Sequence, residues 1–257
     1  MSWQAEITGS FAREALAAAP PAGGEVCALF RRSFYLRFPE ERYACVGDLS
    51  LGRGPLNVLV RDFRPGEVGE RVSISLEGAS LWTPPALSPP SANALSALER
   101  AARGRTPEEG LGGLVAGTHN SLAIHAQPAL EALDGWLVGH AFGPEAEKLV
   151  GLGPGLTPSG DDYLGGMLVA LRAYGRAQQA DSLWRWLKPR LARTSAISGA
   201  HLTAAASGEA HEALHEALGI LFSGAQDWEP ALRRLDAVGH CSGWDGLAGV
   251  VAVARRA

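Results

Sequence analysis

Residues 149–166 read LVGLGPGLTPSGDDYLGG, and this stretch organises the second half of the chain. Three glycines, Gly151, Gly153 and Gly155, stand at alternate positions, and glycine adopts the positive φ angles of tight turns at little steric cost. An apolar helical pattern follows, and the free N–H groups at a helix N-terminus attract anions. The stretch therefore predicts a loop that binds phosphate or another small anion. It has neither the G-K-[ST] of a Walker loop nor the spacing of a dinucleotide-binding loop.

A purely structural interpretation explains part of the same stretch. Ser159 and Asp162 fit the S-x-x-D variant of the capping box, in which the two side chains satisfy backbone N–H groups at the start of a helix. This interpretation leaves Thr157, Gly160 and Asp161 without a role, so both interpretations stay open. If Asp162 is a cap, its loss costs about 1 kcal/mol. Loss of Asp161 is then expected to abolish ligand binding and to leave melting almost unchanged.

The pattern S-G-x-D-x-L-x-G occurs twice, at residues 159–166 and again at 242–249. In both copies the apolar residues that follow recur at helical spacing, which is typical of one buried helix face. Glycines within the pattern would let two such helices approach closely. We therefore expect the two copies to pack as a pair with their N-termini on one side, which adds Ser242 and Asp245 to the site. The alternative is that two capped helices share a cap sequence by chance.

The residues GLGPGLTPSGDDYLGG, together with residues 194–198 and the later GHCSGWDGLAG, resemble a bacterial family that was first catalogued as a domain of unknown function. That family is now linked to a subunit of oxamate carbamoyltransferase in allantoin catabolism, a branch of purine degradation. The likeness extends over nearly the whole chain, and its most specific part is GLTPSGDD. The resemblance implies carbamoyl transfer between carbamoyl phosphate and oxamate, or a related small amide acid. It also implies an assembly with other protein subunits, so the chain alone is either an enzyme or a non-catalytic partner.

Two adjacent carboxylates, Asp161 and Asp162, conflict with an anion-binding loop because they would repel a phosphate. Three arrangements resolve the conflict: a divalent cation such as Mg²⁺ bridges them to phosphate, they accept from the N–H₂ group of an amide substrate, or one only caps the helix. Under the carbamoyl-transfer interpretation the second is favoured, and no cofactor is then required. Carbamoyl transfer needs an orienting clamp and donors to an oxyanion, for which Thr157, Ser159 and the loop N–H groups are candidates.

Residues 194–201 add a second candidate segment. Thr194, Ser195 and Ser198 supply hydroxyls beside Arg193, a combination that could hold a carboxylate or phosphate, and His201 is a candidate base. The alternative is a helix-to-helix connection whose hydroxyls cap the next helix.

Residues 211–215 match the zinc-protease pattern H-E-x-x-H through His211, Glu212 and His215. The surrounding HEALHEAL repeat and the leucine stripe of the same helix argue against a zinc site, and no third histidine follows at the spacing of the metzincin pattern. A zinc hydrolase remains the least favoured of the alternatives.

Composition points to a soluble, cytoplasmic protein. The 257 residues are 46% hydrophobic with a net charge of −4, they contain no basic block for nucleic acid, and no apolar run is long enough to span a membrane. The N-terminus has no signal-peptide pattern. Cys27, Cys45 and Cys241 form no C-x-x-C pair, which favours a reducing compartment.

The expected fold class is α+β, with a small antiparallel β unit at 1–85 followed by an α-helical domain at 86–257 that carries every motif above. Strands are predicted within 27–38, 42–49, 56–63 and 71–82, between turns rich in Gly and Pro. The segment TPPALSPPSA at 83–92 is typical of a linker. Helices are predicted at 92–103, 107–117, 128–140, 161–174, 180–193, 209–222, 229–237 and 244–255.

Overall fold

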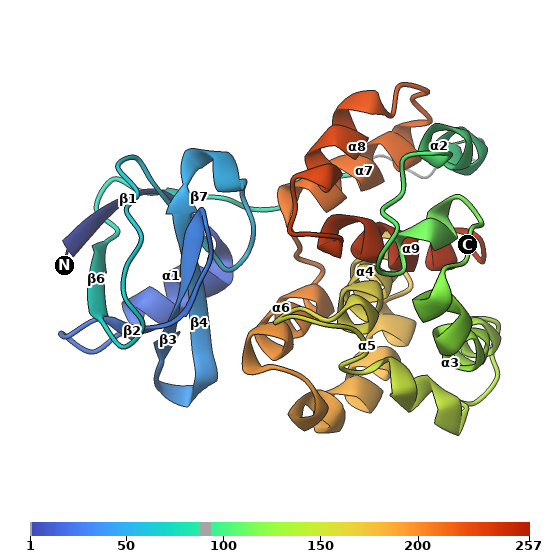
Figure 1. Cartoon of the computed structure of the whole chain (residues 1–257), viewed down its shortest axis with the longest axis horizontal. Coiled ribbons are helices and arrows are strands. Elements are labelled where there is room, and N and C mark those ends of the chain that lie inside the picture. The colour runs from blue at the N-terminus through green and yellow to red at the C-terminus, as the bar shows by residue number, and fades with distance from the viewer. Residues whose placement is uncertain (1, 88–93) are drawn as a thin grey trace. The chain divides into compact units, whose positions relative to one another are not determined.

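The computed structural model describes residues 2–87 and 94–257, which divide into two compact units, Met1–Pro84 and Pro85–Ala257. Strands come first along the chain and helices follow, as Figure 1 shows by colour from blue to red. Residues 88–92 of the predicted linker and the first two residues of the helix predicted at 92–103 lie outside the described part. The expected α+β class, with a β region followed by a helical region, is confirmed.

Seven strands are described in the first unit, and six of them pair in a closed ring. The pairings run β5-β4-β3-β2-β6-β1 and return from β1 to β5, while β7 adds to β1. A ring of this kind leaves few strand edges unpaired. The bounds are β1 Ser2–Thr8, β2 Gly24–Leu29, β3 Ser33–Phe38, β4 Arg42–Asp48, β5 Asn57–Val60, β6 Arg71–Ser75 and β7 Ser80–Leu81.

The expectation of a purely antiparallel sheet is wrong, because the sheet is mixed. β1 runs parallel to β6 and β7, and β4 runs parallel to β5. The short turns between the predicted strands indicated hairpins, and no strand was predicted at the position of β1. The pairing of β1 with β5 and β6, which lie far along the chain, closes the ring. Helix α1, Ser10–Ala17, was also not predicted; its buried Ala12 and Ala15 join the core of this unit.

The second unit consists of helices, and several of them differ from the predicted ones: α3 begins before residue 128, and α5 ends before residue 193. The helix predicted at 107–117 is only a short 3₁₀ turn, in a segment interrupted by Gly110, Gly112, Gly113 and Gly117. The α-helices are α2 Ala94–Ala102, α3 Ser121–Leu137, α4 Ser159–Ala173, α5 Ala177–Leu187, α6 Ala196–Ala206, α7 Glu212–Ser223, α8 Glu229–Asp236 and α9 Ser242–Ala254. The 3₁₀ helices are η3 Gly112–Val115, η4 Pro144–Leu149 and η5 Lys188–Arg193. None of the described helices is long and apolar enough to cross a membrane.

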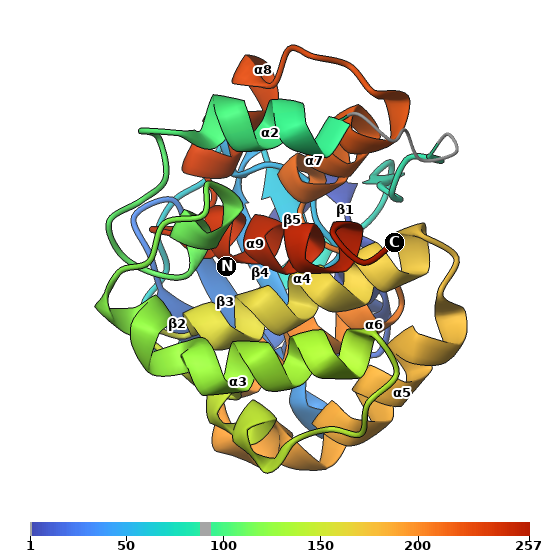
Figure 2. The same ribbon diagram turned by 90° about the vertical axis from the view of Figure 1, so that its right-hand side faces the viewer.

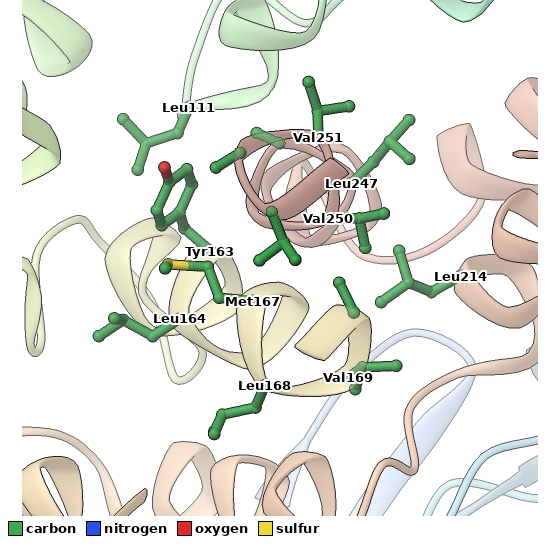
Figure 3. Close-up of a cluster of buried hydrophobic side chains, with 14 of the residues drawn as sticks. Leu111, Tyr163, Leu164, Met167, Leu168, Val169, Leu214, Leu247, Val250 and Val251 are labelled. Carbon is green, nitrogen blue, oxygen red and sulfur yellow. The ribbon is translucent and has the colours of Figure 1, made fainter. Parts of the chain in front are cut away.

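Helices α4 and α9 pack directly against each other in the interior of this unit, and Figure 2 shows them side by side between α2 and α3. Nearly every residue of α9 from Gly243 to Val253 is buried, as is most of α4. Figure 3 shows the apolar side chains around the pair, among them Tyr163 and Met167 of α4 and Leu247 and Val250 of α9. The hypothesis that the two copies of the repeated pattern form a packed pair is confirmed.

One glycine on each helix packs against the backbone of the other helix. A Cβ atom on Gly166 would overlap the carbonyl oxygen of Gly246, and a Cβ atom on Gly249 would overlap the carbonyl oxygen of Tyr163. Counted from the serine of each copy, both glycines stand at the eighth position and both carbonyls at the fifth. The two helices are therefore related by a local pseudo-two-fold arrangement, in which each copy presents the same position to the other.

We predict that Gly166→Ala destabilises the protein by about 1–3 kcal/mol, because its methyl group would have to displace the backbone of α9. Gly165→Ala is the matched control, since an added Cβ there meets only side-chain atoms at 3.7 and 3.8 Å. The control should be neutral or stabilise the helix by about 0.5–1 kcal/mol. Urea unfolding of both variants tests this, and equal stabilities would contradict the close approach of α4 and α9.

Candidate functional site

The glycine loop adopts the turn conformation that its sequence predicts. The φ angles are 75° at Gly151, 113° at Gly153 and 90° at Gly155, values that residues other than glycine rarely adopt. Helix α4 begins at Ser159 with Pro158 as its N-cap, and no side chain caps it. The N–H groups of Asp161 and Asp162 both donate to the Pro158 carbonyl, at 2.9 and 3.0 Å. The capping box considered for Ser159 and Asp162 is therefore not formed.

Asp161 is buried and holds three segments of the chain together. Its Oδ1 accepts from the Gly151 N–H at 2.8 Å, and its Oδ2 accepts from the hydroxyls of Ser198, at 2.7 Å, and Thr194. Both oxygens are thus used by donors of the protein. These contacts contradict the expectation that loss of Asp161 leaves melting almost unchanged, because its carboxylate links the loop to the segment that begins α6.

The segment 194–198 both caps a helix and touches the loop. Ser195 is the N-cap of α6, with its Oγ accepting from the Ser198 N–H at 2.9 Å, and the same hydroxyl donates to the Leu156 carbonyl. The structural alternative for this segment is therefore correct for Ser195. Helix α6 was not predicted. Its mixture of small and apolar residues, AISGAHLTAAA, gives no amphipathic stripe.

Three residues of the predicted site, Arg193, His201 and Gly160, have surroundings other than those expected. The Arg193 guanidinium pairs with Glu147 at 3.0 Å instead of facing the hydroxyls, although the Arg193 backbone carbonyl packs closely against Gly151. Burial and the neighbouring His211 lower the pKa of His201 to about 4, so its imidazole is neutral at pH 7. Gly160 serves the packing of α4, because a Cβ atom there would overlap the Leu149 carbonyl oxygen.

In each copy of the repeated pattern, the serine lies near the aspartate at the fourth position of the other copy. The Ser242 hydroxyl lies near the carboxyl of Asp162 and lowers its pKa, and the Ser159 hydroxyl lies near the carboxyl of Asp245 and lowers its pKa. Thr157 Oγ1 also lies 3.1 Å from Ser242 Oγ, which joins the loop to the start of α9. The serine and aspartate of the S-x-x-D pattern therefore interact with residues of the other helix and do not cap their own helix.

Both paired carboxyls are poorly solvated. Burial raises the pKa of Asp162 well above its usual value, and the nearby Asp245 raises it further. Burial likewise raises the pKa of Asp245, whose Oδ1 accepts from the Leu111 N–H at 2.6 Å. Within the described part of the chain, the buried Oδ2 atoms of both residues have no partner with hydrogen-bond geometry. Buried carboxyl oxygens without a donor are costly, so this pair requires an explanation.

Two neighbours of the pair were not predicted as site residues. Cys241 Sγ lies 3.8 Å from Ser159 Oγ, and burial together with Asp245 raises the pKa of the Cys241 thiol to about 12. The thiol is therefore protonated at pH 7 and is a poor nucleophile. Gly110, with φ of 75°, packs against the carboxylate of Asp245 so closely that a side chain there would displace it. The cluster of glycines at 110–113 is the one sequence signal that could have indicated this contact.

The residues of the H-E-x-x-H pattern are arranged for capping rather than for zinc. His211 is the N-cap of α7, with Nδ1 accepting from the Ala213 N–H at 3.2 Å, and His215 Nε2 accepts from the Ala210 N–H at 3.1 Å. Across residues 2–87 and 94–257, no group of three or more His, Cys, Asp or Glu side chains is arranged to hold a metal ion. These contacts remove the basis for the zinc-hydrolase alternative.

We predict that Asp161→Ala destabilises the protein by roughly 3 kcal/mol or more, because it leaves one N–H and two hydroxyls without their acceptor. The control is Asp181→Ala, which removes only an exposed ion pair with Arg172 and should cost at most about 1 kcal/mol. Chemical denaturation of the two variants measures the difference. A cost for Asp161→Ala no larger than that of the control would contradict the structural role of its carboxylate.

We predict a pH dependence of stability from Asp162. A carboxyl whose pKa is raised in the folded state keeps its proton after the unfolded chain has lost it, so stability falls as pH rises above about 4, the pKa of an unfolded aspartate. Asp162→Asn should therefore lose less stability than the wild type between pH 5 and pH 8. Melting temperatures at both pH values test this, with Asp181→Asn as the exposed control. If the melting temperatures of Asp162→Asn and the wild type change equally between pH 5 and pH 8, the raised pKa of Asp162 in the folded state is contradicted.

No curated protein and no solved structure was found to be similar to this chain. A family comparison does give a match, and it covers the glycine loop, both copies of the repeated pattern and all helices from α4 to α9. The resemblance predicted from the sequence is confirmed over this span: residues 149–254 match the family described as oxamate carbamoyltransferase subunit AllH.

Proposed function

We propose that this chain is a subunit of an oxamate carbamoyltransferase and takes part in carbamoyl transfer between carbamoyl phosphate and oxamate or a related small amide acid. The observation that carries this proposal is the family match over 149–254, whose span includes every candidate residue of the loop and of the two paired helices. A subunit family implies other protein subunits. Those subunits would complete the enzyme.

The glycine loop is the proposed binding site for the anionic group of the substrate. Within the described residues, the N–H groups of Gly155, Leu156 and Thr157 form no hydrogen bond, and they directly precede the uncapped N-terminus of α4. Free backbone N–H groups and a helix N-terminus together favour a bound anion. In this proposal Gly151 and Gly153 shape the loop, and Asp161, Thr194, Ser195 and Ser198 hold it in place.

The hydroxyls beside the loop are the proposed donors to the reacting carbonyl group. Thr157, Ser159 and Ser242 lie together where the loop meets the start of α9. When the nitrogen of oxamate attacks the carbamoyl carbon, negative charge develops on the carbonyl oxygen, and fixed donors stabilise it. The C–O bond to phosphate then breaks, and the phosphate leaves with the proton that the attacking nitrogen gives up. This chemistry needs no resident cofactor.

We predict that carbamoyl phosphate binds the protein without added metal and more tightly than inorganic phosphate does. Isothermal titration calorimetry of both ligands, with and without a chelator, measures this. Gly155→Ala should weaken the binding of both ligands. A residue with a side chain is strained at the φ of 90° that Gly155 adopts, so the substitution would distort the loop. Gly175→Ala is the matched control, with φ of 70° and equally open surroundings at the far end of α4.

The competing function is that of a non-catalytic partner subunit. It predicts that the chain binds neither carbamoyl phosphate nor phosphate, yet forms a stable complex with the other subunits of such an enzyme. Size-exclusion chromatography of the co-expressed proteins detects the complex, and the calorimetric titration decides between the two functions. Binding that vanishes with the chelator would instead show that the aspartates act through a bridging cation.

A further inference from the structure

The geometry points to Asp162 and Asp245 as a two-point acceptor for the N–H₂ group of a substrate that is a primary amide carrying a nearby anionic group. This inference rests on the proposed function and names the residues by which its site would recognise the substrate. It differs from the prediction made from sequence, in which Asp161 and Asp162 acted together, because Asp161 has both oxygens occupied.

The first step of the argument is the symmetry of the two carboxyls. Asp162 and Asp245 stand at the same position of the repeated pattern, and each lies near the serine of the other copy, which lowers its pKa. The reciprocal glycine contacts of α4 and α9 hold the two first turns together. The two carboxyls are close enough for the charge of Asp245 to act on Asp162. They therefore form one site and not two separate ones.

The second step is that each carboxyl has one oxygen without a donor. Asp245 is 0% exposed, and although Leu111, Ser159 and Cys241 surround its carboxyl, none of them reaches Oδ2 with hydrogen-bond geometry. The Oδ2 atom of Asp162 is buried and lacks a donor in the same way. No cationic side chain of the described residues forms an ion pair with either carboxyl. Donors from outside the protein would satisfy both oxygens.

The third step identifies the chemistry of that donor. In this inference the two acceptor oxygens, at the first turns of the paired helices, each accept one N–H bond of a single nitrogen, and the loop at Gly155 to Thr157 offers free N–H groups to the anionic group of the same ligand. A carbamoyl or oxamic amide presents this combination of an N–H₂ group and a negative charge. A hard metal ion would need further oxygen ligands, and the described residues provide no third acidic group in place.

The fourth step concerns access. Asp162 is only partly buried as a residue, whereas Asp245 is fully buried, so the open side of the pair is that of Asp162. On this side the hydrogen bond between Thr157 and Ser242 joins the loop to α9. Entry of the amide between the carboxyls would replace this contact, and the two hydroxyls would then be released toward the substrate.

The test compares ligands that differ only in the N–H₂ group. Acetyl phosphate has a methyl group where carbamoyl phosphate has its amide nitrogen, and pyruvate relates to oxamate in the same way. We expect the full-length protein to bind each amide at least about 100-fold more tightly than its methyl analogue, because a site built to accept N–H donors rejects a ligand that lacks them. In Asp162→Ala and Asp245→Ala this ratio should fall to within a few fold, while inorganic phosphate binds as in the wild type.

Controls separate this inference from the proposed function. Asp162→Asn and Asp245→Asn preserve the shape of the side chains and serve if an alanine variant fails to fold; they should lower the ratio as well. Asp181→Ala should keep the ratio of the wild type. If the wild type binds phosphate but does not distinguish amide from methyl, or if the variants keep its ratio, the carboxyls are a structural pair and the inference is overturned while the loop proposal stands. If neither phosphate nor carbamoyl phosphate binds, the proposed function itself fails.

Discussion

The contact between the backbones of α4 and α9 is the constraint on which the second unit depends. Gly166 and Gly249 bring each helix against a carbonyl of the other, at a separation that no side chain would permit. The surrounding apolar residues then close over the pair, so that the approach is stabilised by burial as well as by shape (Figure 3). Everything at the N-terminal ends of these helices is positioned by this contact.

One consequence is that the site is built between the helices rather than within either of them. Neither α4 nor α9 has a side-chain cap, although both begin with a serine followed three residues later by an aspartate. Each serine instead lies near the carboxyl of the opposite helix and lowers its pKa. Among the described residues, the N–H groups of Gly155, Leu156 and Thr157 in the loop before α4 form no hydrogen bond, and an anion is the partner that such groups favour.

The two adjacent aspartates of α4 have different surroundings and therefore different roles. Successive helical residues point about 100° apart, so Asp161 turns toward the loop and α6 while Asp162 turns toward α9. Asp161 finds three donors and becomes a structural link. Asp162 finds one serine and a second carboxyl, which leaves it in a strained electrostatic environment of the kind that active sites often contain.

How much could be predicted from the sequence follows from the range of the interactions involved. The glycine turn, the start of α4 and the repeated pattern are local features, since positive φ, helical period and motif spacing are properties of short segments. The sequence also supported the pairing of α4 with α9, because two similar motifs with glycine at the same position suggest similar surroundings. It did not reveal β1, α1 or α6, whose short or uniformly small segments carry no distinct pattern. Only the tertiary structure decided that both oxygens of Asp161 accept hydrogen bonds, that Asp162 lies near Asp245 and that each serine lies near the aspartate of the other helix. These facts depend on which distant segments come together, and no local pattern encodes that.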